Sequence, residues 1–128
     1  MIDLVKFIAA CATPYDHVHN NCLMTATEAF QGAASVSRIR EWWQHLDENY
    51  RVALSTGAAQ IDLDELFYGH GFSRATGPTG CEIGAIKQLP EAPPVFVVGA
   101  RGVWFARGVS RAVRVPRPAI VTHAWGVT

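Results

Sequence analysis

The spacing of hydrophobic and polar positions changes beyond the middle of the chain. In the first part, apolar residues recur at three- and four-residue steps, which is typical of amphipathic helices that pack on a core. From Ala75 onward the apolar runs are short and are separated by turns rich in glycine and proline, which is typical of strands. The pattern therefore predicts an α+β fold in which N-terminal helices pack on a C-terminal antiparallel β-sheet.

Four helical segments are predicted in the first part, each bounded by residues that cap or stop helices. The expected ranges are Ile2 to Ala12, Cys22 to about Gly32, Ser35 to Gly57 as one long helix or two short ones, and Asp62 to Gly69 or Gly71. Asn21 is the expected N-cap of the second helix, and Asp62 with Glu65 resembles a capping box at the start of the fourth.

Five strand-like runs follow a turn at residues 75–80. They are Cys81 to Gln88, Val95 to Val98, Val103 to Ala106, Ala112 to Val115 and Val121 to Val127. The stretches Gly99 to Gly102 and Arg107-Gly108 are expected to form hairpin turns. The length fits a single domain over residues 1–128, with a helical half over about 1–74 and a strand half over about 80–128.

The low and balanced charge of the chain argues against one class of function, nucleic-acid binding. Eleven basic and eleven acidic side chains cancel, and only 17% of residues are charged, so no basic surface for nucleic acid is expected. No apolar run approaches the roughly 20 residues that a membrane-spanning helix needs.

The charged residues are unevenly distributed along the chain although the net charge is zero. Such a distribution favours oriented docking between neighbouring subunits. Arginines lie in the strand half at 101, 107, 111, 114 and 117, and acidic residues lie in the helical half at 47, 48, 62, 64 and 65.

The N-terminal run and the cysteines bear on localisation. Lys6 precedes an apolar stretch as in a signal peptide, but the stretch is short and Asp3 lies where basic residues would be expected, so the segment is interpreted as part of the mature protein. Cys11, Cys22 and Cys81 are odd in number and share no C-x-x-C spacing. Reduced thiols in a bacterial cytoplasm are therefore expected rather than a disulfide framework.

Cys22 is the candidate catalytic nucleophile. It follows a turn-forming stretch and begins a helix, where unpaired N–H groups and the helix dipole favour the thiolate. A nucleophilic cysteine also needs a base within hydrogen-bond reach, and His123 and His70 are the candidate bases. The alternative is that Cys22 is a small residue filling space at a helix start, and that both histidines are structural.

Two further groups have open interpretations. His17, His19 and Cys22 offer ligand types that zinc accepts, but the spacing is not a standard zinc pattern, so neither a metal nor another cofactor is expected. Trp42 and Trp43 point about 100° apart on a helix, so one indole can enter the core while the other anchors a partner surface, or both can be buried.

The order of these features resembles the NlpC-like family of papain-like fold. The matching stretches are Asn21-Cys22, Gly80 to Ile83, Val95 to Ala106 and His123 to Val127, and together they span nearly the whole chain. The resemblance is to the small branch encoded among the tail genes of bacteriophages, prophages and gene transfer agents. Active members of the family are cysteine amidases or peptidases that act on peptidoglycan stem peptides.

Two departures from the family pattern concern the chemistry. Asn21 replaces the usual Asp before the cysteine, and Pro93-Pro94 stands where active members have the histidine that opens the strand. Proline cannot accept a proton, so the usual Cys–His pair is missing. The resemblance therefore implies an inactive domain of a phage or phage-like tail tip or baseplate. Such a domain is made in the bacterial cytoplasm, is not exported by a signal peptide and binds neighbouring tail hub proteins.

Under that interpretation, the residues expected to contact partners are Trp42, Trp43, Arg101 and Arg107. The alternative is an active amidase or peptidase that cuts peptidoglycan stem peptides with Cys22 as its nucleophile.

Overall fold

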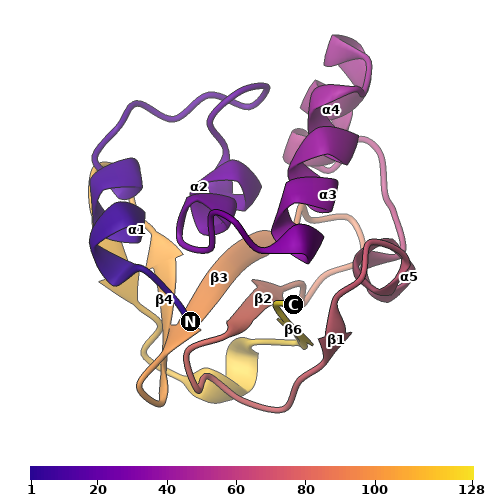
Figure 1. Cartoon of the computed structure of the whole chain (residues 1–128). Coiled ribbons are helices and arrows are strands. Elements are labelled where there is room, and N and C mark those ends of the chain that lie inside the picture. The colour runs from indigo at the N-terminus through magenta and orange to yellow at the C-terminus, as the bar shows by residue number, and fades with distance from the viewer.

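The computed structural model describes residues 1–128 as five α-helices followed by a six-stranded antiparallel sheet (Figure 1). The helices are α1 (Leu4–Cys11), α2 (Cys22–Glu28), α3 (Ala34–Gln44), α4 (Glu48–Thr56) and α5 (Leu63–Gly69). The strands are β1 (Ser73–Arg74), β2 (Glu82–Ile86), β3 (Val95–Ala100), β4 (Val103–Arg107), β5 (Ala112–Arg114) and β6 (His123–Gly126), with a 3₁₀ turn η1 (Pro118–Ile120) before β6. The predicted α+β class, with helices first and strands second, is confirmed.

The last strand lies inside the sheet rather than at its edge. The strand order is β1-β6-β2-β3-β4-β5, so β6 pairs with both β1 and β2. β2, β3, β4 and β5 follow one another as an antiparallel meander. The two edges of the sheet are therefore the very short strands β1 and β5.

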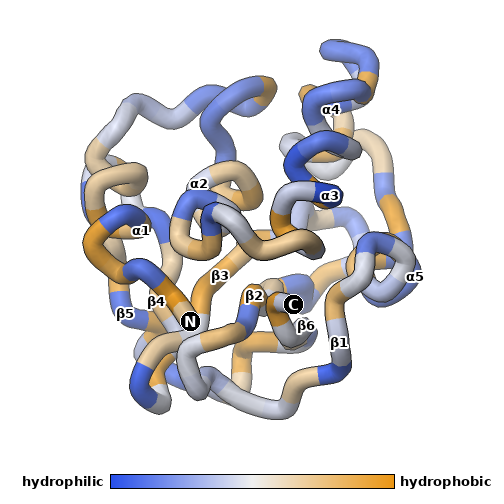
Figure 2. Tube along the Cα trace, viewed as in Figure 1, coloured by the Kyte–Doolittle hydropathy of each residue, from blue (hydrophilic) through white to orange (hydrophobic).

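The main core lies between the helices and one face of the sheet. α2 packs on β3 and β4, α1 on α2 and β5, and α5 on β6, so the helices cover this face from end to end (Figure 1). Figure 2 shows β3 as predominantly hydrophobic, whereas α4 and the loop after α1 are hydrophilic. None of the five helices combines the length and the apolar content needed to cross a lipid bilayer.

Trp125 is the centre of this core. Its ring is fully buried and stacks on Phe67 with centroids 3.8 Å apart. Its indole Nε1 donates a hydrogen bond of 2.8 Å to the Asp64 carboxylate. Because Phe67 and Asp64 both belong to α5, this tryptophan holds α5 against β6.

A smaller core covers the opposite face of the sheet. Val97, Trp104 and Val115 are buried there under the segment that contains η1. The Trp104 ring lies directly on Gly84, where an added Cβ would come within 3.0 Å of the ring and 2.8 Å of the His123 carbonyl oxygen. A glycine in the middle of β2 therefore makes room for an indole.

The long helical segment predicted over Ser35 to Gly57 is two helices. Asp47 interrupts it because its side chain accepts a hydrogen bond from the Asn49 N–H and so caps α4. Gly57 ends α4 in the left-handed conformation, with φ of 86°. The predicted caps Asn21 and Asp62 also accept backbone hydrogen bonds, from the Met24 and Glu65 N–H groups.

Strand positions agree with the sequence pattern, whereas β1 and η1 were not predicted. The β3–β4 hairpin turns at Arg101-Gly102, both at positive φ, as the two-residue loop requires. The second predicted turn, at Arg107-Gly108, connects β4 to β5. β1 has only two residues, and nothing in its sequence distinguishes it from the surrounding loop.

Candidate functional site

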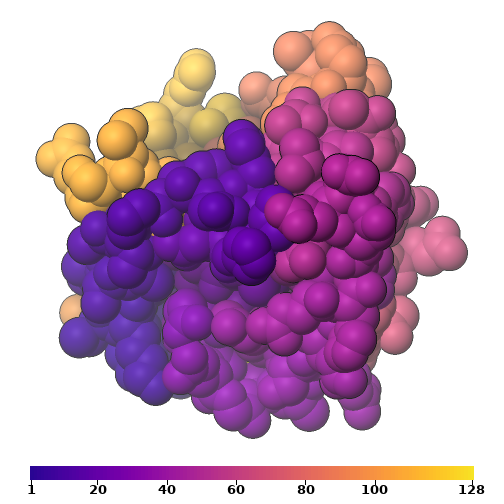
Figure 3. All heavy atoms as spheres, turned by 90° about the horizontal axis from the view of Figure 1, so that it is seen from above, coloured from indigo at the N-terminus to yellow at the C-terminus, as the bar shows by residue number.

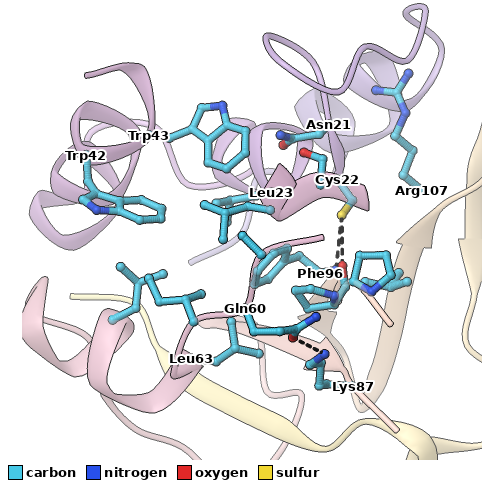
Figure 4. Close-up of a pocket in the computed structure, with 18 of the residues that line it drawn as sticks. Asn21, Cys22, Leu23, Trp42, Trp43, Gln60, Leu63, Lys87, Phe96 and Arg107 are labelled. Carbon is cyan, nitrogen blue, oxygen red and sulfur yellow. Dashed lines mark hydrogen bonds between the residues drawn. The ribbon is translucent and has the colours of Figure 1, made fainter. Parts of the chain in front are cut away.

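A pocket of about 220 Å³ opens between the helices and the β2–β3 loop, with Cys22 in its wall (Figure 4). Twelve of its nineteen lining residues are hydrophobic. One side is formed by Trp42, Trp43 and Leu23, and Phe96 and Leu63 lie on the other. The lining includes neither an acidic residue nor a histidine.

Cys22 is the first residue of α2, as predicted. Asn21 is 3% exposed, and its side chain caps the helix while donating to the His17 carbonyl oxygen. The Cys22 sulfur points toward the start of β3 (Figure 4). It donates to the Pro94 carbonyl oxygen at 3.8 Å and accepts from the Phe96 N–H at 3.5 Å.

The protonation state of Cys22 differs from the expectation of a stabilised thiolate. Burial of the sulfur raises the pKa of the Cys22 thiol above its ordinary value of 9.0, and this effect outweighs the N–H groups of Phe96, Cys22 and Leu23, which lower it. The Pro94 carbonyl acts in the same direction, since it accepts from a thiol and would repel a thiolate. The structure thus favours a protonated sulfur at neutral pH.

The two candidate bases are held elsewhere by other contacts. His70 ends α5, where its Nδ1 lies 2.7 Å from the Leu66 carbonyl oxygen and its ring lies beside Trp42. His123 stacks on Trp125, with its Nδ1 2.8 Å from the Thr122 hydroxyl. Neither ring lines the pocket that contains Cys22, so neither is in place as its base.

The prolines occupy the position at which the resemblance places a histidine. Pro93 and Pro94 directly precede β3 and line the pocket. What faces the sulfur there is main chain: a carbonyl oxygen and an N–H group. The Phe96 side chain lies in the main core and stacks on Phe67 with centroids 5.7 Å apart. The start of β3 therefore contributes core packing beside the sulfur.

Both tryptophans line the pocket, but they differ in exposure. Trp43 is 4% exposed and donates from Nε1 to the Val18 carbonyl oxygen at 2.8 Å. Trp42 is half-buried and forms one wall of the pocket (Figure 4). Of the two indoles, Trp42 is the more exposed and therefore offers more contact area to a ligand or partner in the pocket.

The two arginines predicted to contact partners differ in their surroundings. Arg107 bonds inside the molecule: its Nη1 donates to the Ala10 carbonyl at 3.0 Å and the Thr25 hydroxyl at 2.8 Å, and its Nη2 donates to the Thr13 carbonyl. This guanidinium holds β4 against the loop after α1. Arg101 is exposed at the β3–β4 turn. Partner binding by either arginine stays a prediction.

The polar and aromatic pocket residues that sequence reasoning missed include Tyr15, Gln60 and Lys87. The Lys87 ammonium donates to the Gln60 side chain at 2.7 Å and to the carbonyls of Leu89, Pro90 and Ala92. It therefore fixes the loop that ends in the two prolines. Nothing in the spacing of these residues could have placed them beside Cys22.

Tyr15 does not supply the missing base. Burial, and secondarily the proximity of Cys22, raise the pKa of the Tyr15 phenol above its ordinary value of 10.0. The phenol is therefore protonated at neutral pH and cannot accept a proton from the sulfur. It contributes an aromatic wall to the pocket.

The metal alternative receives no support from the geometry. No group of three or more His, Cys, Asp or Glu side chains is arranged to hold a metal ion. His17 lies against Tyr15, and His19 Nδ1 is 3.6 Å from the Asp16 carboxylate. Cys11, Cys22 and Cys81 are all free cysteines.

Comparison with protein-family models, curated proteins and solved structures finds no significant match. The NlpC-like resemblance therefore rests on the motifs of the chain itself.

Proposed function

We propose that the chain is a non-catalytic NlpC-like domain that serves as a structural component of a phage or phage-like tail tip or baseplate. In this role it binds neighbouring tail hub proteins of the same particle. The observation that carries the non-catalytic part is the surroundings of the Cys22 sulfur, which faces a carbonyl oxygen and an N–H group where a general base would be needed.

The chemistry of cysteine hydrolysis explains why this observation supports a non-catalytic role. The thiolate is the attacking species, and an adjacent base both generates it and later protonates the leaving group. Burial raises the pKa of Cys22, and no histidine lines the pocket. The pocket therefore contains no imidazole to generate the thiolate and then protonate the leaving group.

The placement in a tail rests on the resemblance to the tail-gene branch of the family. The binding role is consistent with the pocket, because an apolar recess with aromatic walls suits an anchoring side chain of a partner. Tyr15 and Val95 line the pocket and are 46% and 40% exposed, so apolar side chains are accessible at its opening.

The alternative is a cysteine amidase or peptidase that cuts peptidoglycan stem peptides. One observation favours it: Cys22 begins a helix and borders a pocket, as a nucleophile would. In that case a base would have to reach the sulfur from His123 or His70, which the structure holds elsewhere.

The test compares particles made with the unchanged chain, with Cys22→Ala and without the chain. The proposal predicts that the chain co-purifies with tails, that its deletion stops tail assembly, and that Cys22→Ala particles assemble and infect normally. Intact Cys22→Ala particles that have lost cell-wall hydrolysis would support the enzyme instead. Tails that assemble normally without the chain would contradict the structural role.

A further inference from the structure

The strand half of the molecule carries an unneutralised positive charge. From Ala92 to Thr128 the chain contains five arginines and no aspartate or glutamate. Arg114 is the last residue of edge strand β5, Arg111 directly precedes the strand and Arg117 follows it. All three side chains are exposed. The only ion pairs in the structure are His19–Asp16 and Arg40–Glu28, so none of these three arginines has an acidic partner.

Apolar side chains lie among these charges. Val109 in the β4–β5 turn is 94% exposed, and Val113 on β5 is 39% exposed. We define the basic face by Val109, Arg111, Val113, Arg114 and Arg117. Exposed valines beside arginines suit a protein partner, because arginine and apolar groups occur together in protein interfaces. Nucleic acid would instead favour a continuous basic surface on a chain of net positive charge.

The helical half carries the complementary charge. Among residues 47–65 there are five acidic side chains and one basic one, Arg51. We define the acidic end by Asp47, Glu48, Asp62, Asp64 and Glu65, which lie at the starts of α4 and α5 and are all exposed. Asp62 and Glu65 also line a shallow groove beside α5.

The basic face and the acidic end lie on opposite sides of the molecule. β5 forms one edge of the sheet, whereas α5 packs on β6 near the other edge. Figure 1 shows α4 and α5 on the side away from α1 and β4, and in Figure 3 the amber atoms of the β4–β5 region project opposite the magenta atoms of α3 and α4. The two charged surfaces therefore cannot neutralise each other within one copy.

We propose that copies of this chain associate head to tail, with the basic face of one copy seated on the acidic end of the next. Guanidinium groups match carboxylates in a planar, two-bond geometry, and the exposed valines supply apolar contact area. A standard interface of about 800 Å² per partner would cover about one eighth of the 6800 Å² surface of the chain. This association goes beyond the proposed tail function and does not depend on it.

Such a contact uses two different surfaces, so a pair of copies still has one basic face and one acidic end free. The contact then closes into a ring if the rotation between copies permits, and otherwise extends into a filament. Screening weakens it, since the Debye length falls to about 3 Å at about 1 M salt. Association should therefore be strong at low ionic strength and lost at high salt.

The first experiment is sedimentation velocity over a range of protein concentrations, at low salt and at about 1 M salt. The proposal predicts species larger than the 14.0 kDa monomer at low salt that dissociate at high salt. A monomer at every concentration under low salt would overturn it. Association that is equally strong at about 1 M salt would also overturn it, because charge would then not hold the copies together.

Two charge-reversal variants identify the surfaces. Arg111→Glu with Arg114→Glu reverses the basic face, and Glu48→Lys with Glu65→Lys reverses the acidic end. Each variant alone should associate at least about tenfold more weakly, because like charges then meet across the contact. Arg74→Glu, an exposed reversal at the opposite edge strand β1, is the matched control and should not weaken association.

Mixing the two variants distinguishes loss of the contact from loss of the folded structure as the cause of weaker association. The intact acidic end of the first variant can receive the intact basic face of the second, so an equimolar mixture should recover association that neither variant shows alone. A mixture that stays monomeric although both variants retain the circular dichroism spectrum of the unchanged chain would overturn the proposal. A wild-type chain that binds a short DNA duplex but does not self-associate would also overturn it and would assign the basic face to nucleic acid.

Discussion

At the level of single residues, the surroundings of the Cys22 sulfur determine whether it is present as thiol or thiolate. A helix start lowers a thiol pKa, and the N–H groups of Phe96, Cys22 and Leu23 act in that direction here. Desolvation acts in the opposite direction and is the larger effect. The pKa of Cys22 is therefore determined more by burial of the sulfur than by the helix that the residue begins.

The raised pKa of Cys22 predicts slow alkylation at neutral pH. Since the thiolate is the reactive form, the rate with iodoacetamide should lie below that of glutathione at pH 7 and should keep rising with pH through 9.0. Mass spectrometry of the peptide that contains Cys22 distinguishes it from Cys11 and Cys81. A rate that reaches its plateau below pH 7 would mean a stabilised thiolate and would refute the assignment.

Glu82 is a buried carboxylate that holds the turn before β2. It is 6% exposed and accepts from the Gly80 N–H at 2.9 Å, the Cys81 N–H at 3.2 Å and the Thr79 hydroxyl. Glu82→Ala leaves these donors without a partner, so the free energy of unfolding should fall by about 2 kcal/mol or more in urea titrations. Glu82→Gln, which keeps an acceptor oxygen, should cost less.

Glu91→Ala is the matched control for Glu82→Ala, because Glu91 is exposed and forms no ion pair. Its free energy of unfolding should change by less than about 0.5 kcal/mol. Equal losses for the two alanine variants would show that the Glu82 hydrogen bonds contribute little to stability.

At the scale of elements, the fit between β2 and β4 depends on a glycine. Gly84→Ala would place a Cβ within 3.0 Å of the Trp104 ring, so the strand or the indole must move. We expect a loss of about 1–3 kcal/mol in the free energy of unfolding. Gly69→Ala, at the end of α5 with no atom near the added Cβ, should be neutral or stabilising by up to about 1 kcal/mol. Similar losses for both would contradict this packing.

Arg107 connects β4 to the loop after α1. Arg107→Lys keeps the charge but cannot reach the Ala10 carbonyl, the Thr13 carbonyl and the Thr25 hydroxyl together. Amide hydrogen exchange should therefore accelerate over residues 12–20, while the exposed Arg111→Lys leaves exchange there unchanged. Unchanged exchange in both variants would show that the loop is held by its other contacts.

Local pattern in the sequence predicted most of the elements, because caps, turns and periodicity are properties of neighbouring residues. Asn21 and Asp62 cap the helices that they were expected to cap, and Arg101-Gly102 turns the hairpin. The insertion of β6 between β1 and β2 was not predictable in this way, since it depends on pairing between distant segments.

The candidate site shows the same division between local and distant information. Cys22 at a helix start could be predicted, because its place depends on Asn21 beside it. The state of its thiol could not, because it depends on burial and on the Pro94 carbonyl, 72 positions further along the chain. The internal bonds of Arg107 likewise join β4 to residues near the N-terminus.

At the level of the whole molecule, we propose that a domain resembling cysteine hydrolases, but without a histidine beside its cysteine, serves as a binding component. The helices and the sheet form a continuous core of twenty buried residues, and the pocket opens between them without an imidazole in its wall. The surfaces available for binding are the apolar pocket beside Cys22, the basic face and the acidic end.

The non-catalytic role of the chain is tested by measuring, with mass spectrometry, the peptide fragments that the unchanged chain and Cys22→Ala release from purified peptidoglycan. We predict no release above background for either chain at any pH from 5 to about 9. Release by the unchanged chain that disappears in Cys22→Ala would contradict it, because the sulfur would then be acting as a nucleophile.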